Sequence, residues 1–179
     1  MILPTEFQRT TSAVVVREIT PDDAADYLHL RLQIDRETKF MVFAPDASML
    51  SPRRLRGRLE LMLASDNQTI FVAEQAGELI GFLCATGGVY RHDHHTAQIV
   101  IGVRQAFTRQ GIGTRLMQTC EHWARERQLR RLELGVMPHN IAALALYHKA
   151  GFTIEGTAKC ALCIDGEYVD LHTMGKCLS

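Results

Sequence analysis

The sequence lacks net charge and long apolar runs, and each absence excludes a class of protein. Twenty basic residues balance twenty acidic ones, so there is no overall field for nucleic acid or an anionic membrane. No apolar segment approaches the roughly 20 residues of a membrane span. The N-terminus also lacks the basic-then-apolar order of a signal peptide. We therefore expect no nucleic acid and no membrane as partner, and a cytoplasmic location.

The sequence also lacks a disulfide framework and a metal motif. Its five cysteines are odd in number and irregularly spaced, which indicates reduced thiols. Cys160 and Cys163 are spaced as C-x-x-C, but residues three apart on a strand face opposite ways, which argues against a metal or redox pair. Residues 90–95 hold three histidines beside Asp93, crowded into one turn without the spacing of a zinc site. We therefore expect no bound metal.

The length of 179 residues suits one domain with a sizeable core. Residues 1–12 show no periodicity and are interpreted as an N-terminal extension, and residues 13–179 as a single domain. Apolar periodicity predicts strands over 13–19, 68–74, 79–86, 97–103, 129–137, 152–164 and 167–176. It predicts helices over 20–35, 51–63, 111–128 and 141–150. The strand–helix–strand run from 97 to 137 implies a parallel strand pair joined by a right-handed crossover.

The loop between the strand that ends at Val103 and the following helix carries the first functional signal. Gly111 and Gly113 can bring backbone N–H groups close to a ligand, while the helix start presents its positive dipole end. Arg109 and Arg115 add positive charge, so the loop favours a phosphate or pyrophosphate. A tight connection whose glycines merely let the helix pack would show the same residues.

A second motif follows the strand over 129–137. It reads Asn140-Ile141-Ala142-Ala143-Leu144-Ala145-Leu146-Tyr147-His148-Lys149-Ala150-Gly151-Phe152. Together with the glycine loop, it resembles the GNAT superfamily of acetyl-CoA-dependent N-acetyltransferases. In that family a Gln/Arg-x-x-Gly-x-Gly/Ala loop precedes an Asn-x-x-Ala-x-x-Leu-Tyr-x-Lys-x-Gly-Phe segment. The segment matches at every named position, whereas Thr108 stands where the loop usually has Gln or Arg. The tail around Ile164 to Met174 is similar to that of polyamine-type and ribosomal-protein-type acetyltransferases.

The resemblance implies an α/β (α+β) fold around a mixed, mostly antiparallel sheet of about six to seven strands. About four helices would cover the two faces of this sheet. A local bulge at Gly102 would splay one parallel strand pair and open a cleft for the thioester of acetyl-CoA. Family members often form homodimers, so a homodimer is also expected.

The resemblance also assigns residues to the co-substrate. Tyr147 is the expected catalytic residue, as a proton donor to the CoA thiolate that leaves. The residues that it implies for acetyl-CoA binding are Ile101, Gly102, Val103, Thr108, Arg109, Gln110, Gly111, Ile112, Gly113, Thr114, Asn140, Ala143 and Lys149.

The acceptor-binding residues are expected between the first two helices. Glu37, Phe40 and Met41 are the candidates, and Glu37 could hold a cationic amine. Gln98 stands where relatives often have a glutamate that relays a proton, and a neutral amide cannot be a base. Water or another residue must then take the proton from the amine, and Glu37, His94 and His95 are the candidate residues.

The sequence therefore predicts an enzyme that moves the acetyl group of acetyl-CoA to a primary amine of a small molecule, by direct attack in a ternary complex. Two alternatives stay open. The first is a protein acetyltransferase that acts on an N-terminus or a lysine, which would need an open peptide groove. The second is a regulatory module that binds acetyl-CoA without turning it over.

Overall fold

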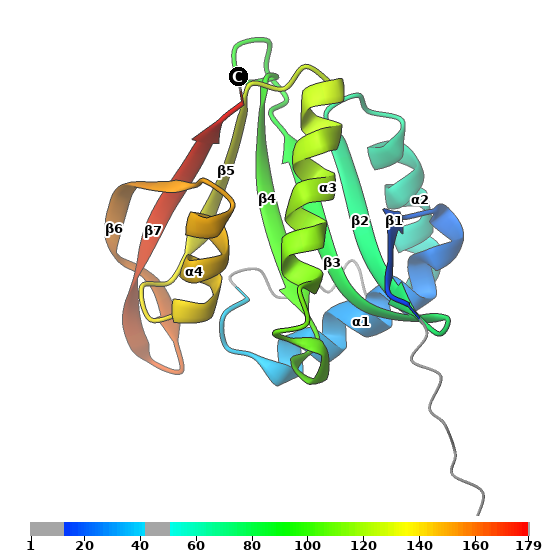
Figure 1. Ribbon diagram of the computed structural model, residues 1–179, viewed down its shortest axis with the longest axis horizontal. Helices are drawn as coiled ribbons and strands as arrows, with labels where there is room; N and C mark the ends of the chain where they lie inside the picture. Colours follow the sequence, from blue (N-terminus) through cyan, green and yellow to red (C-terminus); the bar gives the residue numbers. More distant parts are fainter. Residues whose placement is uncertain (1–12, 42–50, 179) are drawn as a thin grey trace, which may run out of the picture.

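The computed structural model describes residues 13–41 and 51–178, and the predicted extension at 1–12 lies outside these ranges. Within them, seven strands form one mixed sheet in the order β1-β2-β3-β4-β5-β7-β6 (Figure 1). The strands are β1 (Val15–Glu18), β2 (Gln68–Gln75), β3 (Glu78–Gly87), β4 (Thr96–Val103), β5 (Arg131–Val136), β6 (Thr153–Ile164) and β7 (Glu167–Cys177). The α-helices of these ranges are α1 (Ala24–Glu37), α2 (Pro52–Leu63), α3 (Ile112–Glu126) and α4 (Ile141–Lys149). The predicted fold class is confirmed.

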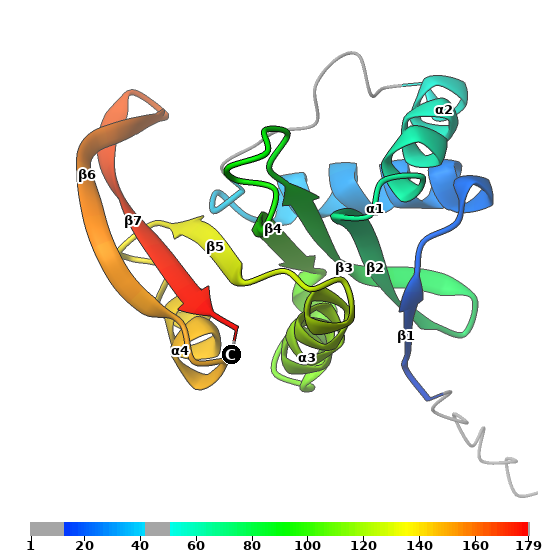
Figure 2. The ribbon, with the colours of Figure 1, turned by 90° about the horizontal axis from the view of Figure 1, so that it is seen from above.

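The helices cover the two faces of the sheet in pairs. Figure 2 shows α1 and α2 on one side and α3 and α4 on the other. Alternation along β3 explains this, because successive side chains of a strand point to opposite faces. Leu83 and Ala85 pack in the cluster that contains α3 residues, whereas Phe82 packs in the cluster that contains α1 and α2 residues. The sheet is therefore buried on both faces where the helices lie.

Two local features differ from the predictions. α1 continues to Glu37, where the backbone N–H of Thr38 still donates to the Ile34 carbonyl over 3.1 Å. In β6, the pairing jumps from Ala158–Leu171 to Leu162–Val169, and Cys160 has a positive φ of 52°. The regular alternation assumed for Cys160 and Cys163 is therefore wrong, although both are free, exposed thiols.

The parallel neighbours β4 and β5 stay together over a short stretch. They pair from Thr96–Arg131 to Gln98–Glu133, and no further pair between them occurs in the described part of the chain. β4 remains paired with β3 up to Val103, without a register shift. The expected bulge is therefore not seen in that ladder. A Cβ on Gly102 would lie 2.7 Å from the Phe82 ring, so packing against this side chain favours glycine here.

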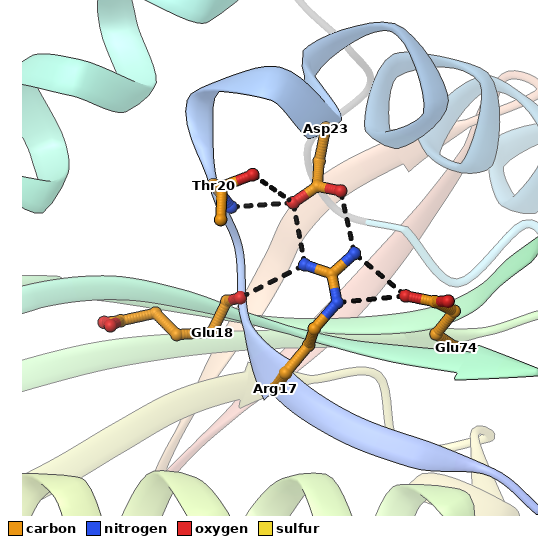
Figure 3. A network of polar contacts seen from close by, with 5 residues as sticks. All are labelled: Arg17, Glu18, Thr20, Asp23 and Glu74. Carbon is orange, nitrogen blue, oxygen red and sulfur yellow. Dashed lines mark hydrogen bonds and ion pairs between the residues drawn. The ribbon is translucent and has the colours of Figure 1, made fainter. Parts of the chain in front are cut away.

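An ion network fixes the start of α1 to the sheet (Figure 3). The Arg17 guanidinium donates to both carboxylate oxygens of Asp23 at 2.8 Å and to Glu74 at 3.0 Å. Asp23 also accepts from the backbone N–H of Thr20 over 2.7 Å, as a capping residue does. The Arg17 hydrogen bonds are the main reason that the pKa of Asp23 falls to about 2.

Removal of the Asp23 charge is expected to destabilise the chain in a pH-dependent way. Its pKa is lower in the folded chain, so its stabilising effect is complete above about pH 4 and is lost as the pH falls towards 2. In urea unfolding, Asp23→Asn should lower the free energy of unfolding by about 1–2 kcal/mol near pH 7, and the difference should shrink towards pH 2. The control is Asp22→Asn, whose side chain is 82% exposed. A gap that is constant with pH would contradict this account.

Replacement of two glycines by alanine should change the free energy of unfolding in opposite directions. Gly111 has a φ of 79°, which costs a residue with a Cβ about 1–2 kcal/mol, so Gly111→Ala should lower the free energy of unfolding by that amount. Gly57 lies inside α2 with no atom within 4 Å of a built Cβ. Gly57→Ala should therefore raise it by about 0.5–1 kcal/mol. Thermal and urea unfolding would measure both changes in the free energy of unfolding. Changes of the same sign would contradict this explanation from backbone conformation.

Candidate functional site

A cavity of about 610 Å³ opens where β4 and β5 separate. Its walls come from the end of α1, the end of β4, the loop that leads into α3, the end of β5, and α4. It brings together most of the predicted site residues: Glu37, Phe40, Met41, Ile101, Gly102, Val103, Thr108, Arg109, Gly111, Ile112, Gly113, Thr114, Asn140, Ala143 and Tyr147. The separation of two parallel strands thus creates one chamber from segments far apart in the sequence.

The start of α3 presents backbone donors to this chamber. Gly111 is the N-cap, and the first intrahelical bond runs from the N–H of Arg115 to the Gly111 carbonyl over 3.0 Å. The N–H groups of the preceding helical residues lack helical acceptors for geometric reasons. No side chain of the described residues caps this end. Free donors and the positive end of the helix dipole together favour an anionic ligand.

Glycine is needed at Gly113 for packing between helices. A Cβ at this position would lie 3.0 Å from a terminal methyl group of Leu146 in α4. Since α4 also carries the cavity residues Asn140 and Tyr147, this contact packs the start of α3 against the α4 wall of the cavity. The tight-packing interpretation of this glycine agrees with this contact, and the ligand-binding interpretation stays a prediction.

The basic and amide side chains of the loop take different directions. Arg109 lines the cavity, with a positive φ of 61°. Arg115 instead donates to the Val14 carbonyl over 2.8 Å, so its charge serves the start of the sheet. Gln110 donates to the Ala106 carbonyl within the loop, and Lys149 is exposed at the end of α4. Gln110 and Lys149, both predicted site residues, do not line the cavity.

α4 contributes two polar side chains to the cavity. Asn140 caps the helix, because its side-chain oxygen accepts from the backbone N–H of Ala143 over 3.2 Å. Its side-chain N–H groups make no hydrogen bond to a described residue and can meet a ligand. Tyr147 is 7% exposed and lines the same wall. Burial raises its pKa to about 12, so the hydroxyl keeps its proton and can donate a hydrogen bond at neutral pH.

The segment after α1 closes one side of the cavity. The Phe40 ring lies 5.3 Å from the His139 ring, which precedes α4. Lys39 forms an ion pair with Asp165, in the turn between β6 and β7. Residues 38–41 are therefore connected to both C-terminal elements, and Phe40 and Met41 face the chamber beneath them.

Of the three residues proposed as the base, one lies at the cavity and two lie away from it. Glu37 lines the cavity, but His94 and His95 do not. His94 lies in the loop between β3 and β4, where its ring nitrogens are 2.9 Å from the Asn67 amide nitrogen and 3.1 Å from the Asp66 carboxylate. Gln98 also lies outside the lining and pairs in register with Glu133 of β5. Glu37, Arg109 and Tyr147 are the ionisable side chains among the described lining residues.

Some lining residues were missed by the sequence interpretation. They are Ile34, Thr38, Gln105, Phe107, Gly135, Val136, Met137, Ala142 and Leu146. The end of β5 could have been found, because ligands of parallel strand pairs bind beyond the carboxyl ends of both strands. Ile34 gave no such signal, since an apolar residue of an amphipathic helix is usually core.

Two other kinds of functional feature, a metal site and a membrane-spanning helix, are absent from the described residues. They contain no group of three or more histidine, cysteine or acidic side chains that could hold a metal ion. They also contain no helix that is long and apolar enough to cross a membrane.

Comparison with solved structures identifies this architecture. An acetyltransferase of the GNAT family from Streptococcus pneumoniae superimposes with a TM-score of 0.88, with 29% identity over 93% of this chain and 100% of that one. A protein from Salmonella typhimurium, solved with acetyl-CoA, gives a TM-score of 0.83, with 18% identity over 93% of this chain and 95% of that one.

Comparison of sequences agrees. The L-amino acid N-acetyltransferase AaaT of Escherichia coli (strain K12) is 33% identical over 104 residues, which are 56% of this chain. That alignment spans 62% of the relative's own length. Residues 33–152 match the sequence profile of the Acetyltransferase (GNAT) family, a range that holds the glycine loop and all the lining residues of the cavity. The chain therefore belongs to the acetyltransferase (GNAT) family, whose typical co-substrate is acetyl-CoA.

Proposed function

We propose that the protein transfers the acetyl group of acetyl-CoA to a primary amine of a small molecule, by direct attack in a ternary complex. One observation carries this proposal. A single cavity contains the anion-binding end of α3, the gap between β4 and β5, the Tyr147 hydroxyl and the segment after α1. A co-substrate with a diphosphate at one end and a thioester at the other fits this order of surfaces.

Each part of acetyl-CoA would meet a matching surface. The pyrophosphate would accept from the N–H groups at the start of α3, and Arg109 adds charge there. Beyond Gln98, the β4 edge that faces β5 is unpaired in the described chain, so its backbone groups can pair with the amides of the pantetheine arm. The Asn140 side chain would reach the same arm from the opposite wall.

The names of relatives support the class of acceptor. AaaT is called an L-amino acid N-acetyltransferase, and an amino acid offers a primary amine on a small molecule. The structure from Salmonella typhimurium that shares this fold contains acetyl-CoA. These names are properties of those proteins, and they favour an amine acceptor of similar size here.

The reaction has three steps that the cavity must support. The acceptor ammonium, with a usual pKa near 10.4, first loses a proton to water or a base. The neutral amine then attacks the thioester carbon, and the carbonyl oxygen becomes an oxyanion that backbone N–H groups of the free β4 edge can stabilise. Finally the carbon–sulfur bond breaks, and CoA leaves as a thiolate while the amide forms.

Tyr147 is best suited to the last step as a hydrogen-bond donor. Its pKa of about 12 lies above the usual value of a thiol, near 8.5. Complete proton transfer to the thiolate would then cost up to roughly 5 kcal/mol, since each pKa unit corresponds to about 1.4 kcal/mol. A hydrogen bond that stabilises the developing negative charge on sulfur costs no such transfer. We therefore assign Tyr147 to leaving-group stabilisation.

The covering segment favours a small acceptor over a protein. Residues 38–41 contact the loop before α4 through Phe40 and the β6–β7 turn through Lys39. A polypeptide substrate would need an open groove across the side of the cavity where these contacts lie, whereas a small amine would not.

A cytoplasmic location is proposed with this function. The cysteines of the described residues are all free thiols, as in a reducing compartment. The homodimer and the division into an extension and a single domain stay predictions.

A panel of acceptors tests the proposal. With acetyl-CoA fixed and free thiol as readout, small primary amines, including amino acids and polyamines, should react at least tenfold faster in kcat/KM than peptides with the same terminal residue. Faster reaction of peptides would establish a protein acetyltransferase instead. Calorimetric binding of acetyl-CoA without turnover of any acceptor would establish the regulatory module.

Tyr147→Phe should lower kcat about tenfold or more, because it removes the hydroxyl and keeps the ring. The affinity for acetyl-CoA, measured by calorimetry, should change little. Tyr90→Phe is the matched control, since Tyr90 is exposed in the loop between β3 and β4. Unchanged kcat in Tyr147→Phe would exclude this tyrosine from the chemistry.

A further inference from the structure

The carboxylate of Glu37 is bound to the start of the loop that leads into α3. Its Oε2 accepts from the backbone N–H of Gln105 over 2.6 Å, and its Oε1 lies 3.7 Å from Nε of Arg104. We propose that Glu37 is a positioning residue for the CoA pyrophosphate loop, rather than the group that holds the acceptor amine. This inference rests on the proposed function and assigns a role within the same site.

Gln105 is the first residue of the short turn that begins this loop, and its N–H donates to Glu37. Residues 105–107 form a short 3-10 turn, in which Phe107 donates to Arg104 over 2.9 Å and Thr108 donates to Gln105 over 3.3 Å. The first N–H groups of such a turn have no acceptor within it. Glu37 supplies that acceptor from α1. It therefore fixes the start of the turn that directly precedes Thr108 and Arg109 in the cavity wall.

The charge of Glu37 is also committed to a half-buried guanidinium. The side chain of Arg104 is 16% exposed and that of Glu37 is 24% exposed. Arg104 lies 5.5 Å above the Phe107 ring and forms a second ion pair with Glu78. Its buried Nε has no hydrogen-bond partner among the described residues, and Glu37 is the negative charge beside it. Loss of Glu37 would leave Glu78 as the acidic partner of Arg104 among the described residues, and the Gln105 N–H would lose its acceptor.

These contacts change the expected role of Glu37. A carboxylate whose Oε2 already accepts from a backbone N–H, and whose Oε1 lies beside a guanidinium, has fewer free acceptor positions for an ammonium group. Its place at the last turn of α1 has a second consequence, because residues 38–41 follow immediately and cover the cavity. The same side chain therefore links the acceptor side of the cavity to the loop on the CoA side.

The test measures CoA binding with no acceptor present. Calorimetric titration with CoA should show a loss of about tenfold or more in affinity for Glu37→Ala, and a loss within about threefold for Glu37→Gln, whose side-chain oxygen can still accept from Gln105. Glu78→Ala is the matched control, because Glu78 pairs with the Arg104 side chain but accepts no hydrogen bond from residues 105–109 of the described chain and does not line the cavity. It should bind CoA within about twofold of the wild type.

A second readout follows the contact itself. Amide hydrogen exchange at Gln105 in the free protein should accelerate about tenfold or more in Glu37→Ala and remain slow in Glu37→Gln. If Glu37→Ala does not fold, Glu37→Asp replaces it, because the shorter side chain keeps the charge and withdraws the acceptor. Wild-type CoA affinity in these variants, together with a raised KM for the amine, would overturn the proposal. Failure of the wild type to bind CoA would refute the proposed function, while the exchange rate would still report on the contact.

Discussion

The separation of β4 from β5 is the constraint on which the site depends. Parallel pairing ends at Gln98–Glu133, and each strand then follows its outer neighbour: β4 stays with β3 up to Val103, and β5 stays with β7 up to Val136. Ile34 of α1 packs close to Gly102 and would be within 3.2 Å of a Cβ there. The gap is therefore held open by complete ladders on both sides, and the free edge of β4 needs no strain to persist.

The electrostatics of the site are local because the chain has no net charge. The proposed anion site consists of backbone N–H groups at the start of α3 and one lining cation, Arg109. Backbone dipoles cost no side-chain entropy and are already oriented when the ligand arrives. A sequence without excess positive charge can therefore still bind a diphosphate.

The cover over the cavity is held by weaker contacts than its walls. The Lys39–Asp165 pair is exposed on both sides, and solvent screens exposed ion pairs. The Phe40–His139 ring contact is tilted, with ring centroids 5.3 Å apart. In contrast, the walls are strands and helices with buried cores.

The sequence by itself determined the order of strands and helices, the parallel crossover, the glycine loop and the Asn140–Phe152 motif. These features are local, because hydrophobic periodicity, positive φ and helix capping act within a few residues. The tertiary structure decided where long side chains go, since their partners lie far away in the sequence. Arg115 turns to Val14, Gln110 turns back into its own loop, and Glu37 reaches Gln105. No local pattern contains these contacts, and so only the folded chain places the Glu37 carboxylate at the start of the loop that leads into α3.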